Sequence, residues 1–173
     1  MKKITAFAFC LLCTVLAVGQ ENAFNRLDFL IGDWGGNGSG FGNNKSKIES
    51  SFHYVMDGKY IEVVNDSKFE PTEKKPEGEH HIDKGFISYD SNRQLIVFRQ
   101  FNIEGFVNQY VLNDSISNDS TLVFETEDIE NLNGGKARWT IKKLSTTEFE
   151  TIFEVKFPGR EFMCFGTNNL TKK

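Results

Sequence analysis

Alternation of apolar and polar side chains is the clearest pattern along the chain. In EFETIFEVKF, residues 148–157, every second residue is apolar or a threonine, whereas the residues between are mostly charged. A period of two is typical of a β-strand with one face in a core and the other in water. Residues 121–127 and 137–144 repeat this alternation. Further strands are expected at 34–41, 45–54, 58–65, 82–89, 94–101, 106–112 and 161–167, which makes about ten in all.

The segments between these strands are mostly short and carry turn residues. Examples are DG at 57–58, NLNGG at 131–135 and PGRE at 158–161. Strands joined by tight turns run antiparallel, because a parallel crossover needs about a dozen residues or more. Residues 66–81 form one long connection, which is charged and holds two of the three prolines. We expect this connection to be a loop over one mouth of the fold.

These elements predict an all-β fold, namely a single antiparallel up-and-down β-barrel of about ten strands. Closure into a barrel removes the two edge strands that an open sheet would expose. A β-sandwich is also compatible with the alternation. The one expected helix covers residues 22–32, where Phe24, Leu27 and Leu30 are apolar. Because a helix this short is unstable alone, we expect it to cap one end of the barrel.

The first residues have the composition of a secretory signal peptide. Residues 1–19 comprise a basic start, an apolar run of about fifteen residues and small residues before Gln20. The apolar run is short for a membrane span of roughly twenty residues. We therefore expect cleavage after Gly19, export to the periplasm or the medium, and a barrel domain over residues 20–173 with no stable membrane insertion. An uncleaved membrane anchor is the alternative.

Charge and cysteine content narrow the choice of partners. The formal net charge is −4, and it becomes more negative once Lys2 and Lys3 leave with the signal peptide. An acidic surface repels phosphate backbones, so nucleic acid is not an expected partner. Cys164 is the only cysteine within residues 20–173, so no internal disulfide is expected.

Gly32-Asp33-Trp34 lies between the expected helix and the first strand, and a glycine-rich run follows it. This stretch resembles the G-x-W signature of the calycin barrels, which include lipocalins, fatty-acid-binding proteins and nitrobindin-like haem-binding barrels. The wider string LDFLIGDWGGNGSG, residues 27–40, is most similar to the opening of nitrobindin-like domains and of an exported bacterial lipocalin-like family of unknown function. GFISYD, residues 85–90, is similar to a mid-chain motif of that second family.

The resemblance implies roles for a few single residues. An indole buries some 150–250 Å² and can close a barrel end that a short helix leaves wet, so Trp34 is expected to be a structural plug. In lipocalins a basic residue late in the chain stacks over this tryptophan, and Arg160 is the candidate by position. Nitrobindin-like barrels hold haem iron through a histidine on a late strand. No residue from 82 to 173 is a histidine. Haem is therefore disfavoured and no cofactor is expected, with Met163 and Cys164 the remaining candidate iron ligands.

Metal and catalytic motifs are equally sparse. His80 and His81 are adjacent and flanked by Glu79 and Asp83, but neighbouring residues of a strand point to opposite faces. We therefore expect surface histidines beside a charged loop rather than a metal site. The chain has no G-x-S-x-G, H-E-x-x-H or G-x-x-x-x-G-K motif, and no catalytic residue is assigned.

Candidate ligand-contacting residues lie on strand faces that could point into the barrel. Arg99 shares a face with Val97 and Phe101, and an inward arginine would need a partner because an unpaired buried charge is costly. Fatty-acid-binding barrels use interior arginines for a ligand carboxylate, and the resemblance implies the same role for Arg99. In the alternative, the face of Phe98 and Gln100 points inward and Arg99 is solvated. The expected lumen residues are Arg99, Phe101, Tyr110, Phe124, Trp139, Phe149 and Phe153.

We therefore expect an exported barrel that binds a small apolar or amphipathic molecule without catalysis. The alternatives are a structural or interaction module with a solid core, and an enzyme with its site at the barrel mouth. A cavity of roughly 300 Å³ or more behind Phe153 and Trp139 would favour the binding protein, and a filled interior would favour the module. A histidine and a carboxylate converging at one mouth with shifted pKa values would favour the enzyme. The sequence identifies neither the ligand nor the oligomeric state.

Overall fold

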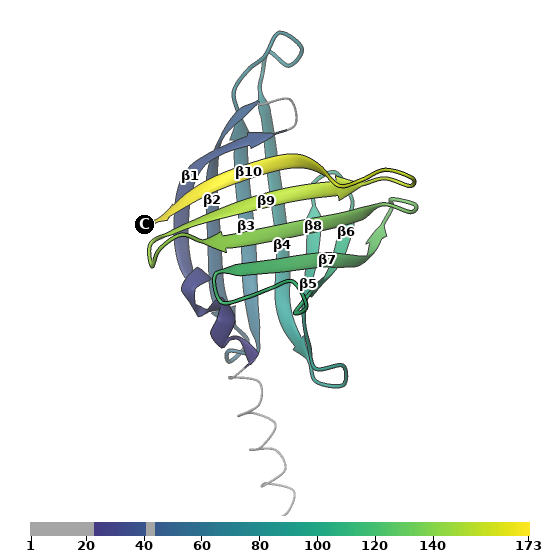
Figure 1. The fold of residues 1–173 in the computed structure, drawn as a ribbon. Helices are drawn as coiled ribbons and strands as arrows, with labels where there is room; N and C mark the ends of the chain where they lie inside the picture. The colour runs from purple at the N-terminus through teal and green to yellow at the C-terminus, as the bar shows by residue number, and fades with distance from the viewer. Residues whose placement is uncertain (1–22, 41–43) are drawn as a thin grey trace, which may run out of the picture.

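The computed structural model describes residues 23–40 and 44–173. Within them, ten strands form one closed antiparallel barrel, and a short 3-10 helix, η1 (Asn25–Leu30), precedes the first strand (Figure 1). The strands are β1 Gly32–Gly40, β2 Lys45–Val55, β3 Tyr60–Phe69, β4 Glu79–Asp90, β5 Leu95–Asn102, β6 Val107–Leu112, β7 Thr121–Glu130, β8 Lys136–Lys143, β9 Glu148–Lys156 and β10 Met163–Lys172.

Each strand pairs with its neighbours in the sequence, and the barrel closes where β1 pairs with β10. Along this closing pair the register runs from Trp34 opposite Lys172 to Gly40 opposite Gly166. In Figure 1, β7–β10 cross in front of β1–β4, so the two halves of the sheet face each other across the interior. The predicted up-and-down barrel is confirmed, and the β-sandwich alternative is wrong.

The long connection predicted at 66–81 is shorter than expected. The β3–β4 ladder extends to Phe69 opposite Glu79, so only residues 70–78 form a loop, which we call the β3–β4 loop. Cross-strand pairing keeps charged residues in the strand conformation, although their local sequence favours a turn. β3 therefore ends later, and β4 begins earlier, than the sequence predicts.

The helix expected over 22–32 is instead one short 3-10 helix of six residues, and residue 22 lies outside the described part of the chain. The backbone is already extended at Ile31. Gly32 then begins β1 with a φ of 129°, a conformation that glycine adopts readily. Leu27 and Leu30 are fully buried in the core. The apolar residues are thus buried by a tighter helix than predicted, as is common for short helical pieces.

Trp34 lies at the same end of the barrel as η1. Its side chain is 1 % exposed, and its indole Nε1 donates a hydrogen bond of 2.7 Å to the backbone oxygen of Leu30. The ring packs edge-on against Phe149 of β9, with ring centroids 4.5 Å apart. The indole therefore joins η1 and β1 to the opposite side of the barrel.

A basic side chain lies over Trp34, but it is Lys172 rather than Arg160. Lys172 Nζ is 5.5 Å from the centre of the indole, and Lys172 is opposite Trp34 in the β1–β10 register. Arg160 lies in the turn after β9, where its backbone N–H donates to Phe157. The positional assignment is wrong because β10 extends beyond its predicted end, to Lys172.

Two glycines allow neighbouring strands to approach closely. A Cβ at Gly36 would lie 1.9 Å from the backbone oxygen of Asn169, and a Cβ at Gly85 would lie 2.0 Å from that of Arg99. No side chain fits at these distances, so these positions require glycine. Gly36 belongs to the glycine-rich run after Trp34, and Gly85 opens the GFISYD motif.

Among the residues that the structure describes, no helix has both the length and the apolar character needed to cross a membrane. Residues 1–19, the predicted signal peptide, lie outside the described ranges. Cleavage and export therefore stay predictions.

Candidate functional site

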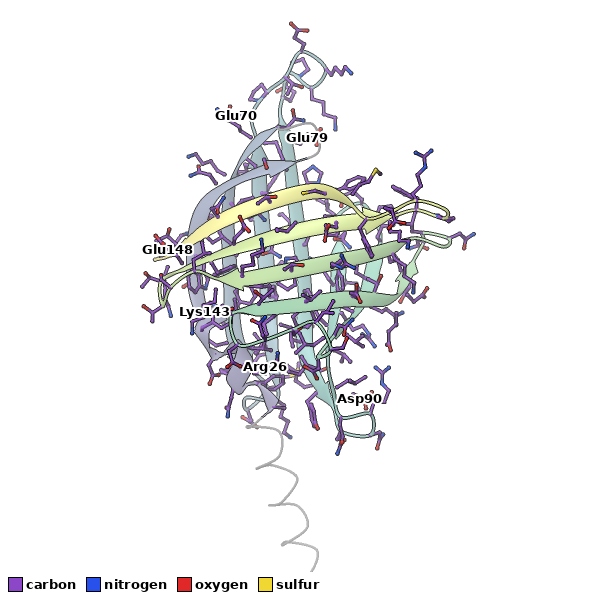
Figure 2. The ribbon with its side chains drawn as sticks, viewed as in Figure 1. Arg26, Glu70, Glu79, Asp90, Lys143 and Glu148 are labelled. Atoms are coloured by element: carbon purple, nitrogen blue, oxygen red, sulfur yellow. The ribbon has the colours of Figure 1, made fainter. Side chains whose placement is uncertain are left out.

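The barrel interior contains a cavity of about 1060 Å³. The cavity lies away from Trp34. Trp34 is near the start of β1, whereas the β1 residues that line the cavity, Ser39 and Gly40, are at the end of the strand. Residues 72–75 of the β3–β4 loop line it at the mouth. Figure 2 labels Glu79 at this end of the barrel and Arg26 of η1 toward the opposite end. The interior is not filled by side chains, which argues against the solid-core module.

The wall formed by β3 to β6 is largely polar, with Phe69 at the end of β3 as an apolar exception. Alternate side chains of these strands point inward, because strand residues two apart share a face. The inward polar residues are Asn65, Ser67, Glu79, His81, Asp83, Gln100, Asn102 and Asn108.

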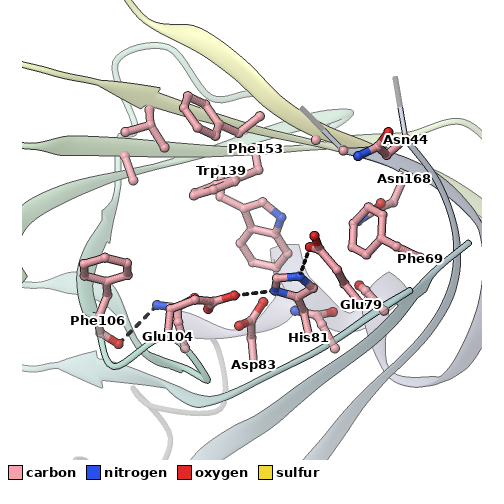
Figure 3. Close-up of a pocket in the computed structure, with 18 of the residues that line it drawn as sticks. Asn44, Phe69, Glu79, His81, Asp83, Glu104, Phe106, Trp139, Phe153 and Asn168 are labelled. Atoms are coloured by element: carbon pink, nitrogen blue, oxygen red, sulfur yellow. Dashed lines mark hydrogen bonds and ion pairs between the residues drawn. The ribbon is translucent and has the colours of Figure 1, made fainter. Parts of the chain in front are cut away.

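The opposite wall, formed by β7 to β10, is largely apolar. Thr151 and Asn168 are its polar side chains. Figure 3 shows Trp139 and Phe153 on this wall, across the cavity from His81 and Asp83. The apolar residues are Ile129, Ala137, Trp139, Phe153, Val155 and Phe165. A molecule in this cavity would therefore meet hydrogen-bonding groups on one side and aromatic surface on the other.

Buried hydrogen bonds hold the deepest polar residues of the wall. The side-chain amide of Asn108 donates to Gln100 Oε1 at 3.1 Å and to the Tyr110 hydroxyl at 3.2 Å. The ring of Tyr110 stacks on Phe98, with centroids 5.7 Å apart. Burial, together with the negative charge of Asp83, raises the pKa of Tyr110 above its ordinary value. The phenol therefore stays protonated at physiological pH.

Three carboxylates and one imidazole gather near the mouth, and we call Glu79, His81, Asp83 and Glu104 the carboxylate cluster. His81 Nε2 lies 2.9 Å from Glu79 Oε2, and His81 Nδ1 contacts Glu104 Oε1 (Figure 3). Glu79 also forms an ion pair with Lys75 of the β3–β4 loop. Asp83 follows His81 on the same face of β4. The cluster therefore joins residues of β4 with the turn between β5 and β6.

Asp83 has an altered proton affinity within this cluster. Burial raises the pKa of its carboxyl group to about 7, and the negative charge of Glu104 acts in the same direction, whereas His81 lowers it. A group with this pKa is partly protonated at neutral pH, so it can either donate or accept a proton.

The structure separates the predicted lumen residues into three groups. Tyr110, Trp139 and Phe153 line the cavity. Phe124 and Phe149 are fully buried in the core but do not line it. The third group, Arg99 and Phe101, lies on the other face of β5 and is described next.

Arg99 and Phe101 do not face the cavity. Phe101 is 53 % exposed, and Arg99 Nη1 donates to the backbone oxygen of Tyr110 at 3.2 Å. The neighbouring face, with Phe98 fully buried and Gln100 lining the cavity, points inward. The prediction that Arg99 points into the barrel is therefore wrong. The alternative, in which Phe98 and Gln100 point inward and Arg99 is solvated, describes β5. Both faces of β5 are apolar near Leu95, so local alternation did not determine the orientation.

Sequence reasoning missed the carboxylate cluster. His80 and His81 do point to opposite faces, as expected for adjacent strand residues: His80 pairs with Asp66 at 2.9 Å, whereas His81 lines the cavity. The expectation of a surface position is thus wrong for His81. The spacing of Glu79, His81 and Asp83 at alternate positions was the available signal. Because the sequence predicts a strand that begins only at residue 82, it does not place Glu79 and His81 on the same strand face as Asp83.

The residues around the cavity do not fit haem. His81 is the only histidine among the cavity-lining residues that the structure describes, and carboxylates contact both of its ring nitrogens. The cluster would also repel haem propionates. Met163 and Cys164 are exposed outside the cavity. Within the described ranges, no group of three or more His, Cys, Asp or Glu residues is arranged to hold a metal ion.

No protein-family model matches the chain, and no curated protein matches it. Solved structures do resemble it. Rv2717c from M. tuberculosis shares 16 % sequence identity at a TM-score of 0.64, over 87 % of this chain and 97 % of that chain. Two further structures have lower TM-scores. EF1p2_mFAP2b bound to DFHBI is 13 % identical at 0.47, over 86 % of this chain and 97 % of that one. The redesigned beta barrel mFAP1 bound to DFHBI is 14 % identical at 0.45, over 84 % and 96 %. The similarity to Rv2717c is one of fold.

Proposed function

We propose that this protein is an exported, calycin-like barrel that binds a small amphipathic molecule without transforming it. The cavity of about 1060 Å³, polar on one wall and aromatic on the other, carries this proposal. Ligand pockets in proteins commonly measure about 300–1,000 Å³ and combine apolar surface with a few convergent polar groups. The cavity has both the size and the composition of such a pocket.

The two walls would contribute different parts of the binding free energy. Burial of ligand surface against Trp139 and Phe153 would supply affinity, at roughly 25 cal/mol per Å² removed from water. Hydrogen bonds to residues such as Gln100 and Asn102 would orient the ligand, because buried polar groups left unpaired are costly. A purely apolar ligand would leave the polar wall unsatisfied. We therefore propose an amphipathic ligand rather than a purely apolar one.

We further propose that η1 and Trp34 close the end of the barrel opposite the mouth. Leu27, Leu30 and Trp34 are each at most 1 % exposed and together form part of the core at that end. A ligand would then enter beside the β3–β4 loop, whose residues 72–75 line the cavity.

A cavity-filling pair of variants tests the binding function. Val155→Trp places an indole in the cavity, whereas Ile152→Trp places one on the other face of the same strand, away from the cavity-lining residues. Purified wild-type protein should enhance the fluorescence of the neutral dye Nile red, and Ile152→Trp should retain this. Val155→Trp should lower dye affinity by about tenfold or more while its thermal unfolding stays cooperative. Equal dye binding by all three proteins would place the dye outside the cavity and contradict the proposal.

Native mass spectrometry of protein purified from its own host tests the proposed ligand class and the proposed export. A retained small molecule that is lost in Val155→Trp would support ligand binding, and a retained haem would contradict the proposed ligand class. The same spectrum gives the mass of the polypeptide. A chain that begins at Gln20 would support export with signal cleavage.

A second candidate function is acid–base catalysis at the mouth, and the altered pKa of Asp83 beside His81 and Glu104 favours it. A carboxyl group that titrates near neutrality is suited to proton transfer to or from a bound molecule. The two functions differ in what happens to the ligand. Incubation of the co-purified molecule with fresh protein should leave its mass and isomeric form unchanged if the protein only binds it.

A further inference from the structure

We propose that the cavity is selective for a cationic amphiphile, an organic amine whose ammonium group is held by Asp83 and Glu104 while its apolar body lies against Trp139 and Phe153. This inference rests on the proposed binding function and specifies the class of ligand. It is the reverse of the acidic ligand that an inward Arg99 would have implied.

The first observation is the sign of the charges around the cavity. Among the described residues that line it, the acidic side chains are Glu73, Glu79, Asp83 and Glu104. Lys74 and Lys75 are the lysines among them, both in the β3–β4 loop at the mouth, and Lys75 is paired with Glu79. No arginine is among these lining residues. Outside the β3–β4 loop, the charged or titratable side chains among these lining residues are therefore three carboxyl groups, His81 and the phenol of Tyr110.

The second observation is that two polar side chains facing the cavity have unpaired hydrogen-bonding groups. Thr151 and Gln100 are 4 % and 9 % exposed, and both line the cavity. Gln100 Oε1 accepts from Asn108, but the amide nitrogen of Gln100 and the hydroxyl of Thr151 contact no hydrogen-bonding partner within residues 23–40 and 44–173. Both groups face the cavity, so they are available to hydrogen-bond a polar molecule bound there.

Asp83 provides the anchor for a positive charge. Its side chain lines the cavity and makes no hydrogen bond or ion pair with any described residue, whereas His81 between Glu79 and Glu104 is already engaged. An ammonium group offers three donors and a full positive charge. It would reach a carboxylate in a partly desolvated site, where an ion pair is stronger than in water.

The aromatic wall suits the same ligand. Trp139 and Phe153 face the carboxylate cluster across the cavity (Figure 3). Aromatic side chains cover the hydrocarbon part of an amphiphile whose charged end lies at the opposite wall. A carboxylate ligand, in contrast, would meet Asp83 and Glu104 at the polar wall and be repelled.

Three probes of equal chain length test the inference: decylamine, 1-decanol and decanoate. Each is measured by displacement of Nile red at pH 8, below the micelle concentration of the two charged probes and below the solubility limit of decanol. Decylamine should bind about tenfold or more tightly than decanoate, with decanol between them. Asp83→Asn should lower decylamine affinity about tenfold and leave decanol affinity unchanged. Asp66→Asn is the matched control, because Asp66 is a half-buried carboxylate that pairs with His80 on the other face.

Proton linkage gives a second readout. Decylamine stays charged between pH 6 and pH 8, whereas Asp83 loses its proton over this range, so wild-type affinity should rise with pH and that of Asp83→Asn should rise less. The charged or titratable groups near Asp83 are His81 and Glu79 on β4, Glu104 in the β5–β6 turn, Tyr110 on β6 and Lys75 in the β3–β4 loop. The flanking residues on β3 and β5 are the neutral Asn65 and Asn102.

The outcomes separate this inference from the proposed function. Failure of all three probes and of Nile red to bind wild-type protein would overturn the binding function itself. Binding of decanoate or decanol as tight as that of decylamine would leave the binding function standing and overturn the selectivity for amines. If decylamine still binds to Val155→Trp, it binds at the acidic surface rather than in the cavity. That result would also overturn the proposed selectivity of the cavity for amines. If Asp83→Asn does not fold, the wild-type comparison of the three probes still decides.

Discussion

The indole Nε1 of Trp34 donates a buried hydrogen bond of 2.7 Å to the backbone oxygen of Leu30. This bond joins β1 to Leu30, the last residue of η1. The last carbonyl groups of a helix have no partner within the helix, and the indole provides one for Leu30. Because Trp34 does not line the cavity, its contribution should be to stability rather than to ligand binding.

Trp34→Phe should therefore lower the free energy of unfolding by about 2 kcal/mol, since it removes the hydrogen bond and part of a buried ring. Urea unfolding measures the change, and Nile red affinity of the folded variant should match that of wild type. Lys172→Met is the control, because it keeps the hydrogen bond and removes only the cation over the ring, and it should cost less than about 1 kcal/mol. A loss of dye affinity in folded Trp34→Phe would contradict the separation of the two ends of the barrel.

Arg99→Ala should leave the affinity for Nile red and for decanoate unchanged within about twofold, because the guanidinium lies outside the cavity. Phe153→Ala removes aromatic surface from the cavity wall. It should weaken Nile red binding by about three- to tenfold. Fluorescence titration of the two variants in parallel measures both effects. Weaker decanoate binding in Arg99→Ala would restore the arginine as a ligand contact.

The pKa of Asp83 makes stability depend on pH with a defined sign. An aspartate in an unfolded chain has a pKa of about 3.9, and burial raises that of folded Asp83 to about 7. Between these values the folded state binds more protons, so Asp83 contributes stability that is complete below about pH 4 and lost as the pH rises through about 7.

Asp83→Asn should remove this dependence. Relative to wild type, the ligand-free variant should gain stability with rising pH, by on the order of 2 kcal/mol between pH 4.5 and pH 8, since water in the cavity screens part of the burial cost. Urea unfolding of both proteins across this range measures the difference, and Asp66→Asn should track wild type. A constant difference between Asp83→Asn and wild type at all pH values would show that Asp83 titrates normally.

The sequence by itself determined the architecture. Residues 148–157 alternate with period two, and turns such as that at 57–58 are too short for anything but antiparallel pairing. These are local properties, so they can be read without knowledge of distant residues. The apolar residues before Gly32 likewise predicted buried positions, although they did not predict that the helix would be 3-10.

Tertiary structure alone decided which groups meet inside the barrel. In β5 both faces carry apolar residues, so only closure of the barrel placed Gln100 inward and Arg99 outward. His81 and Glu104 are brought together by the β4–β5 register, in which Asp83 is opposite Asn102. Whether the aromatic residues fill the interior or line a cavity depends on the radius of the closed sheet. That radius is a property of all ten described strands together, and no single segment of sequence encodes it.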